Sequence, residues 1–475
     1  MRSPAPDTLN GTRRMRNATP SNPSLAEPDL VVAGLVRIAD VWQPGEVWVA
    51  DGRISGLLRA ADAPSTTARR LDVGANFVLP GAVDAHVHSL SHAGEGVRAA
   101  TRAAAAGGVT TIVEMPFDGP GPINTVDRLR AKQDLVQREA LIDVALLATL
   151  SPGGGWRRAD ELVSEGAVGF KVSLFDTDPA RFPRIDDREL LDVMKAVGGT
   201  GRTLCVHAEN NEIVKALLRE ESAAPADDSQ AHSRSRPPVS ETLGILTAME
   251  IAATSGNALH LCHLSLPRSV DLASWYMSQG VNISIETCPH YLTFTHEDLD
   301  TQRGRLKINP PLRGRADREG LWERLEEGSV SILSSDHAPW PLAQKDRDRI
   351  LDNHSGIPGV ETLVSMSLGQ AVARGPETFD RTVDAITIGP ARRFGLDRTK
   401  GSLDVGKDAD VTVFSVNSDA RIDGSSLHSN ANWSPYDGHQ PGGVVSLTIS
   451  RGTVVWHAGS GLAGSDGRGR LVSAH

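Results

Sequence analysis

Strand-length apolar runs alternate with amphipathic stretches through the middle of the chain. The runs are short and continuous, whereas stretches such as 187–199 and 241–256 carry apolar residues at the helical period. Repeated alternation of strands and helices predicts a parallel sheet. About eight strand candidates favour an α/β fold of the (β/α)8, or TIM, barrel type over residues 80–395.

The two ends of the chain have a different pattern. Residues 28–79 and 396–475 contain short apolar runs separated by turn signals, with Asp51-Gly52 as a hairpin turn. Because these segments flank the barrel, we expect them to pair into one small β-sandwich domain, with a tail at the C-terminus. Residues 1–27 are rich in Pro, Asn, Ser and Arg without an apolar period, which predicts a disordered leader.

Glycine and proline refine these boundaries. The pairs Gly107-Gly108 and Gly198-Gly199 stand where helices are expected to end, because glycine is preferred just beyond a helix C-terminus. The segment 223–238 is polar and rich in proline, and it is predicted to be a surface loop.

Charge and cysteine content exclude several classes of protein. A formal net charge of −10 argues against a nucleic-acid or polybasic membrane surface. No apolar run approaches the ~18 residues of a membrane span. Neither nucleic acid nor membrane is therefore an expected partner. The three cysteines lie in apolar segments without a CxxC pair, which predicts buried, reduced thiols and a cytoplasmic protein.

The strongest chemical signal is the pair His86 and His88. Side chains two residues apart on a strand point to the same side, so both imidazoles can bind one metal ion. Many such pairs occur without a metal. Here the pair ends a predicted barrel strand, which is where the active sites of these barrels form.

Lys171 lies inside an apolar strand, where an unpaired charge is unfavourable. Burial is expected to lower the pKa of this amine, and a neutral amine reacts with CO2 to give a carbamate. The carbamate is a carboxylate that can bridge two metal ions. The competing interpretation is a lysine that reaches the barrel rim to pair with an acid.

Three more residues, His207, His263 and Asp336, each close a further apolar run. Taken singly, each histidine is also typical of a hydrogen-bonded core residue, and the aspartate of a helix N-cap. With the first three they place six potential ligands at the C-terminal ends of five predicted strands. Six groups suffice for two ions, with two histidines and an aspartate on one, two histidines on the other, and the modified lysine between.

With these residues the chain resembles the cyclic amidohydrolases of the amidohydrolase superfamily, which include allantoinases, hydantoinases, dihydropyrimidinases and dihydroorotases. The resemblance covers about residues 30–460 and includes four further motifs. They are Ala-Ala-Ala-Gly-Gly-Val-Thr-Thr from Ala104, Glu-Thr-Cys-Pro-His-Tyr from Glu286, Asn-Pro-Pro-Leu-Arg from Asn309 and Gly-Ile-Pro-Gly-Val-Glu-Thr from Gly356.

The resemblance implies a homo-oligomer, tetramer or dimer, with two divalent ions, zinc (Zn2+) first and Mn2+ or Co2+ as alternatives. It implies His86, His88 and Asp336 on one ion, His207 and His263 on the other, and carbamylated Lys171 between them. Water activated by the ions would attack the carbonyl of a small cyclic amide. Asp336 would be the catalytic residue that passes the proton to the leaving ring nitrogen.

Several substrate rings stay open. Dihydroorotases have an arginine at the position of Leu90 and an asparagine at that of Phe117. Hydantoinases and dihydropyrimidinases have a tyrosine at the position of Asp176. Allantoinases are the most similar, through segments such as Phe182-Pro-Arg-Ile-Asp-Asp and Ser235-Arg-Pro-Pro-Val-Ser-Glu, although their Glu-Pro-Gly after the histidine pair is missing here.

The resemblance thus favours hydrolysis of allantoin to allantoate, a step of purine catabolism, with a hydantoinase-like or other cyclic imide hydrolase as the alternative. A family member without catalysis is disfavoured because all six ligand positions are present. One that acts on exocyclic or phosphoester bonds is disfavoured by the Gly-Phe-Lys motif that ends at Lys171 and by the Pro-His-Tyr and Asn-Pro-Pro-Leu-Arg segments. Asn309, His290 and Gly359 match segments that contact the substrate in the family, and the same residues also fit turns and backbone hydrogen bonds. His337 could assist in the same way or simply hydrogen-bond the backbone, and Trp340 could form a wall of the pocket or fill the core.

Overall fold

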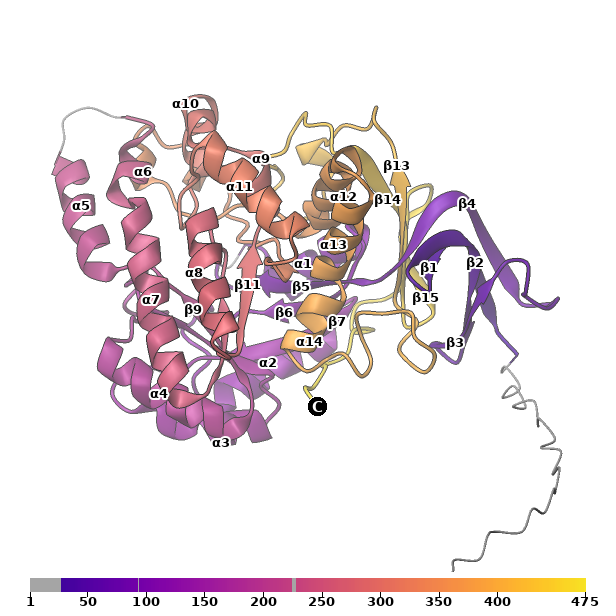
Figure 1. The fold of residues 1–475 in the computed structure, drawn as a ribbon, viewed down its shortest axis with the longest axis horizontal. Helices are drawn as coiled ribbons and strands as arrows, with labels where there is room; N and C mark the ends of the chain where they lie inside the picture. Colours follow the sequence, from indigo (N-terminus) through magenta and orange to yellow (C-terminus); the bar gives the residue numbers. More distant parts are fainter. Residues whose placement is uncertain (1–26, 93, 224–227) are drawn as a thin grey trace, which may run out of the picture.

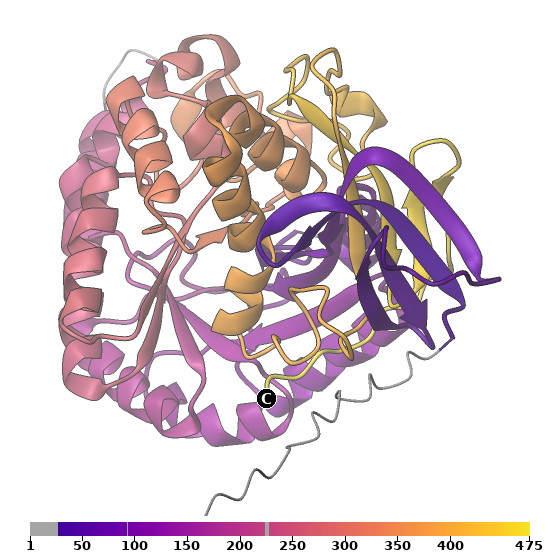
Figure 2. The same ribbon diagram turned by 45° about the vertical axis from the view of Figure 1, so that its right-hand side comes forward.

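The computed structural model describes residues 27–92, 94–223 and 228–475. Figures 1 and 2 show a barrel surrounded by helices, with a second sheet from both ends of the chain packed beside it. The predicted barrel and composite domain are confirmed. The predicted leader, residues 1–27, lies outside the described residues except for Glu27.

Eight parallel strands, in sequence order, form the barrel. Nearly all of their residues are buried, because helices cover the outside and side chains fill the inside; hence they are continuous apolar runs. The strands are β5 (Ala82–Val87), β6 (Val109–Glu114), β7 (Asp143–Ala148), β8 (Gly169–Ser173), β9 (Thr203–His207), β10 (Ala258–Leu261), β11 (Ile283–Thr287) and β12 (Ile332–Leu333).

Helices connect these strands and pack on the outside of the barrel (Figure 1). α4 is typical, because Asp186 accepts a hydrogen bond from the Glu189 N–H (2.9 Å) and apolar side chains of one face are buried. The helices are α1 (Gly96–Ala106), α2 (Val126–Glu139), α3 (Ala159–Ser164), α4 (Asp187–Thr200), α5 (Asn211–Ala223), α6 (Ala231–Ser235), α7 (Pro238–Ser255), α8 (Pro267–Ser278), α9 (Pro289–Thr293), α10 (Leu299–Gln302), α11 (Arg315–Glu326), α12 (Leu363–Arg374), α13 (Pro376–Ile386) and α14 (Ile388–Arg393).

One predicted helix end is wrong. α1 ends before Gly107, as predicted, whereas α4 runs through the pair Gly198-Gly199 to Thr200. Its cap is Gly201, which adopts the left-handed conformation (φ 70°) that glycine reaches without a steric penalty. The sequence offered three glycines at this helix end, and the period of the apolar residues does not distinguish among them.

His337, which lies after the short last strand β12, closes the barrel. The N–H of His337 donates to the carbonyl of His86 (3.2 Å), and the carbonyl of His337 accepts from the N–H of His88 (2.8 Å). The chain that follows β12 is thereby held beside the end of β5. Asp336, one residue earlier, is placed next to both histidines.

Both ends of the chain contribute four strands to the second sheet, in the order β16-β15-β14-β13-β4-β1-β2-β3. The two halves meet where β4 pairs with β13 antiparallel, and the predicted Asp51-Gly52 hairpin turn has positive φ at both residues (51° and 73°). The strands are β1 (Leu30–Ile38), β2 (Val41–Ala50), β3 (Arg53–Arg59), β4 (Arg69–Pro80), β13 (Val411–Val416), β14 (Gly443–Ser450), β15 (Thr453–His457) and β16 (Gly461–Leu462).

Apolar side chains fill the barrel below its C-terminal end, and Cys205 and Cys262 lie among them. All three cysteines are buried and unpaired, as predicted. No helix of the described chain has the length and apolar character of a membrane span.

A buried ion-pair cluster joins the barrel to the second sheet. The Lys400 ammonium lies 2.5 Å from Asp143 Oδ2, 2.8 Å from Asp410 Oδ2 and 3.0 Å from Asp408 Oδ2. Asp143 begins β7 of the barrel, and Asp410 directly precedes β13 of the sheet. Asp143 and Asp410 are buried, and Lys400 is the cation that all three carboxylates share, while Arg451 Nε also lies 3.1 Å from Asp143 Oδ1.

We predict that Lys400→Met destabilises the protein by about 3–5 kcal/mol, because removing one partner leaves buried charges uncompensated. The measurement is the melting temperature by differential scanning fluorimetry. Lys195→Met, at an exposed lysine on α4, is the control. A Lys400→Met melting temperature equal to that of the control would show that the cluster contributes nothing to the domain junction.

Candidate metal centre

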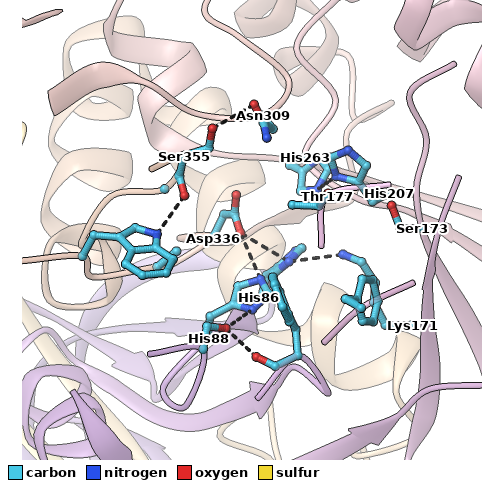
Figure 3. A pocket seen from close by; sticks show the side chains of 16 residues that line it. His86, His88, Lys171, Ser173, Thr177, His207, His263, Asn309, Asp336 and Ser355 are labelled. Atoms are coloured by element: carbon cyan, nitrogen blue, oxygen red, sulfur yellow. Dashed lines mark hydrogen bonds and ion pairs between the residues drawn. The ribbon is translucent and has the colours of Figure 1, made fainter. Parts of the chain in front are cut away.

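All six predicted ligands lie around one cavity at the C-terminal end of the barrel (Figure 3). The strands explain this arrangement, since their carboxyl ends meet at the same rim. His86 is in β5 and His88 follows it, Lys171 is in β8, His207 ends β9, and His263 and Asp336 follow β10 and β12. The cavity has a volume of about 110 Å³.

One group of side chains gathers around Asp336. Its Oδ1 lies 3.3 Å from His86 Nε2 and 3.6 Å from His88 Nε2. Lys171 Nζ lies 3.3 Å from the same His86 nitrogen. Ligand atoms of a tetrahedral zinc ion are about 3.3 Å apart, given bonds of roughly 2.0–2.1 Å. These spacings therefore suit a metal ion.

A second group consists of His207 and His263. His207 Nδ1 faces His263 Nε2 at 3.1 Å, and His263 Nδ1 is buried without a hydrogen-bond partner among the described groups. Burial lowers the pKa of both imidazoles, that of His263 well below its usual value. Two neutral imidazoles that turn nitrogens toward each other fit a shared cation, so this pair also suits a metal ion.

Outer hydrogen bonds fix which nitrogen each histidine presents. The Ser91 hydroxyl donates to the Phe117 carbonyl (2.7 Å), so its oxygen accepts from Nδ1–H of His88 (3.0 Å). The lone pair of His88 Nε2 then points into the cavity. His86 donates from Nδ1–H to a Glu286 carboxylate oxygen (2.9 Å), so its Nε2 faces Asp336 and Lys171 in the cavity. Such partners hold ligands in the orientation that a metal needs.

Glu209 orients His207 and is itself held by Arg236. His207 donates from Nε2 to Glu209 Oε2 (2.8 Å), which also pairs with the buried Arg236 guanidinium. Burial raises the pKa of Glu209, but Arg236 and His207 outweigh it and lower this pKa to about 2. The predicted surface loop over 223–238 is therefore wrong for the C-terminal part of that range. Residues 231–235 form α6, and Arg236 is buried beneath the candidate metal centre.

The prediction for the charge of Lys171 is also wrong for the metal-free protein. Burial lowers its pKa, as expected, but the neighbouring Cys262, Glu286 and Asp336 side chains raise it above the ordinary value. The pattern of a single strand does not reveal these groups, because they come from other strands. The amine is therefore an ammonium until further positive charge enters the site.

Two of the predicted ligands have a backbone conformation that non-glycine residues rarely adopt. His263 has φ 41° and Asp336 has φ 46°. Such conformations cost on the order of 1–3 kcal/mol each and persist where the surrounding structure imposes them. Around Asp336 the Ser335 N–H donates to Asp84 Oδ1 (3.1 Å), and His337 closes the barrel. No residue type in the sequence signals this strain.

Aromatic and polar side chains complete the cavity. Phe117 and Phe182 stack with centroids 5.4 Å apart, and Trp340 lies on the cavity wall. Polar wall groups come from Ser173, Thr177, Asn309 and Ser355 (Figure 3). Apart from Asn309 and Trp340, sequence reasoning had not assigned these residues to the site, because all but Ser173, which ends β8, lie in loops whose paths no periodicity predicts.

The three predicted substrate contacts differ in their placement. Asn309 lines the cavity and accepts a hydrogen bond from Ser355 Oγ (3.1 Å). Gly359 lies behind the wall, where its N–H donates to His337 Nδ1 (3.0 Å), whereas Gly356 faces the cavity. His290 is buried outside the cavity lining, and burial lowers its pKa to about 3.

The position expected to hold a tyrosine in hydantoinases holds Asp176, which pairs with Lys215 of α5 (2.5 Å). Asp176 is not among the residues that line the cavity, and no tyrosine of the described chain is among them. The oxyanion contact that such a tyrosine would supply is therefore missing at this position.

Comparisons with known proteins agree with this geometry. Residues 77–455 match the Amidohydrolase family. The chain is 34% identical over 444 residues to an allantoinase of Rubrobacter xylanophilus, covering 93% of this chain and 97% of that protein. It is 33% identical over 436 residues to an L-hydantoinase of Paenarthrobacter aurescens, covering 90% and 94%.

A solved structure resembles the whole fold. The L-hydantoinase (dihydropyrimidinase) from Arthrobacter aurescens superimposes with a TM-score of 0.89 at 31% identity, covering 94% of this chain and 99% of that one. Since the family match and the relatives span the barrel and both flanking segments, the chain belongs to the amidohydrolase family.

Proposed function

We propose that the chain hydrolyses the ring amide of a cyclic ureide, with allantoin, opened to allantoate, as the first candidate. The observation that carries the proposal is the convergence of four histidines, a lysine and an aspartate on one small cavity. The family and the named relatives support a hydrolase that acts on C–N bonds of cyclic amides.

Two divalent ions suit this set of donors, zinc first and Mn2+ or Co2+ as alternatives. His86, His88 and Asp336 would hold one ion, His207 and His263 the other, and a carbamate on Lys171 would be shared. Bound ions supply a Lewis acid for the ring carbonyl and lower the pKa of water. Because the Lys171 pKa is raised without metal, we infer that the carbamate forms only as the ions bind.

Asp336 is the proposed proton carrier. In the metal-free protein burial raises its pKa to about 6, against the opposing effects of His86 and Lys171, and its carboxylate borders the space where the attacking water would be held. Its Oδ1 is occupied by the two histidines of β5. Oδ2 would take the proton of the attacking water and return it to the ring nitrogen as the C–N bond breaks.

The cavity wall supports recognition of a flat, polar ring. Ser355 donates to Asn309 Oδ1, which leaves the Asn309 amide N–H groups free to donate to a ring carbonyl. Phe117 and Phe182 offer an aromatic face, and Thr177 offers a hydroxyl group to an exocyclic ureido substituent. The L-hydantoinase relatives support a hydantoin as the second candidate, for which the aromatic face would hold an apolar substituent.

We predict that zinc-loaded protein opens allantoin faster than hydantoin, dihydrouracil, dihydroorotate or succinimide in an assay of ring opening. Lys171→Ala should lower kcat by at least about 1,000-fold, because the shared ligand of both ions is lost. Lys195→Ala, at an exposed lysine, is the control. A preference for another ring would make that ring, in place of allantoin, the proposed substrate. Absence of turnover for every ring at full metal occupancy contradicts the proposed function.

We also predict that zinc binds more tightly as the pH rises from 7 to 9. Burial and Lys171 lower the pKa of His86, but Glu286 and Asp336 raise it to about 10, so His86 carries a proton at pH 7. Binding must displace this proton, which gives up to about a tenfold gain in affinity per pH unit. Chelator competition measures the affinity, and calorimetry in two buffers counts the released protons. An affinity that does not change with pH would contradict the assignment of His86 as a ligand.

A further inference from the structure

Two buried side chains outside the ligand set meet beside Asp336. His337 follows it directly, and Glu95 stands just before α1 on the far side of the β5 loop. His337 Nε2 lies 3.4 Å from Glu95 Oε1, and each side chain is 1% exposed. Two polar groups so fully removed from water need specific partners on every hydrogen-bonding atom.

The hydrogen-bond partners of His337 define which of its ring nitrogens carries the hydrogen. Nδ1 accepts from the backbone N–H of Gly359 (3.0 Å) and of Val360 (3.3 Å), so it carries no hydrogen. The ring hydrogen is therefore on Nε2 and points at Glu95. The ring is held on one side by the start of the 360–362 turn and on the other by a carboxylate.

The other oxygen of Glu95 is held by the C-terminal part of the chain. Oε2 accepts from the Ser429 hydroxyl (3.0 Å) and from the Asn430 N–H (2.9 Å). A few residues later Trp433 donates from its indole N–H to the carbonyl of Trp340 (2.9 Å), on the cavity wall. Residues 428–433, here called the 428–433 segment, thus reach the active-site side of the barrel.

The placement of Asp336 depends on its neighbours. Its left-handed backbone is not a preferred conformation, so the residues on both sides must hold it. His337 helps to hold Asp336 in two ways, since its backbone pairs with His86 and His88 and its ring is fixed by Glu95. The Glu95 contact thus fixes the side chain of the residue that follows Asp336 and whose backbone pairs with His86 and His88.

We propose that Glu95 and His337, held by the 428–433 segment, are positioning residues that aim Asp336 at the metal it shares with His86 and His88. This inference rests on the metal centre of the proposed function. It also gives the C-terminal part of the chain a direct role in the barrel's chemistry. Neither residue touches the ring or supplies a ligand.

The test is Glu95→Gln, which keeps the size of the side chain but turns an amide N–H2 toward either His337 Nε2–H or the donors of the 428–433 segment. We expect one of the two zinc ions to bind about tenfold more weakly in chelator competition, and kcat to fall about tenfold, as for other groups behind metal ligands. KM should stay within about twofold, because no substrate contact changes. Ser429→Ala, which removes one donor to Oε2, should give a smaller loss of the same kind.

The matched control is Glu361→Gln. Glu361 holds the same segment, through the N–H and ring of His428 (2.7 and 2.8 Å), but makes no hydrogen bond to His337. Because Glu361 contacts the segment and not His337 or Glu95, its metal affinity and kcat should fall much less than those of Glu95→Gln. The double variant Glu95→Gln with His337→Asn should be no worse than the more impaired single variant, since both act through one contact.

Normal retention of both ions in Glu95→Gln, or losses that multiply in the double variant, would overturn the proposal. An equal loss of zinc affinity in Glu361→Gln would also overturn it, because the effect would then come from general loosening. Zinc retention does not depend on turnover. A chain that opens no ring, yet loses zinc on Glu95→Gln alone, would refute the proposed function and uphold this inference.

Discussion

The carboxylate of Glu286 is the interaction on which the arrangement of the metal centre depends. It is fully buried, and it accepts from His86 Nδ1–H (2.9 Å), from His260 Nε2–H (2.9 Å) and from the backbone N–H of His263 (2.9 Å). Burial raises the pKa of this acid, but His86 and the hydrogen bonds of His260 outweigh it, so the acid stays ionised. One anion thus sets the position of a ligand in each of the two groups.

This constraint explains why the barrel tolerates so many polar groups at its rim. A buried charge needs close partners, and Glu286 finds them in histidine groups on both oxygens, whereas Glu209 pairs through Oε2 with His207 and Arg236. The same groups orient imidazole lone pairs toward the cavity. Folding and preparation of the site for cations are therefore one event, and the hydrogen bond from the His263 N–H to Glu286 helps to maintain the strained backbone at His263.

The parts of this structure that follow a repeating sequence pattern could be predicted from the sequence. Period-two spacing places His86 and His88 on one side of a strand, a charged residue in an apolar run marks Lys171, and strand ends mark the other three ligands. The alternation of strands and helices was sufficient to predict the barrel. The absence of that alternation at both ends of the chain was sufficient to predict the composite domain. These are local patterns, and each is visible within about ten residues.

Contacts between distant segments were not predictable in this way. The charge of Lys171 depends on Cys262 and Glu286, from other strands, and the role of Arg236 depends on Glu209. A polar stretch is typical of a loop whether its arginine faces solvent or a buried acid. Likewise nothing in the residue types near Gly198 reveals which of the three glycines ends α4.

The pairing of β4 with β13 has a consequence for how the protein is made. β4 is complete at Pro80, but its partner begins at Val411, more than 300 residues later. At ribosomal rates of about 5–20 residues per second, the edge of β4 waits roughly half a minute for that partner. An uncovered strand edge is a template for pairing with other chains. During that interval the barrel is synthesised while the edge of β4 is still unpaired. Crowding of nascent chains on one messenger RNA therefore favours exchange of C-terminal strands between neighbouring chains.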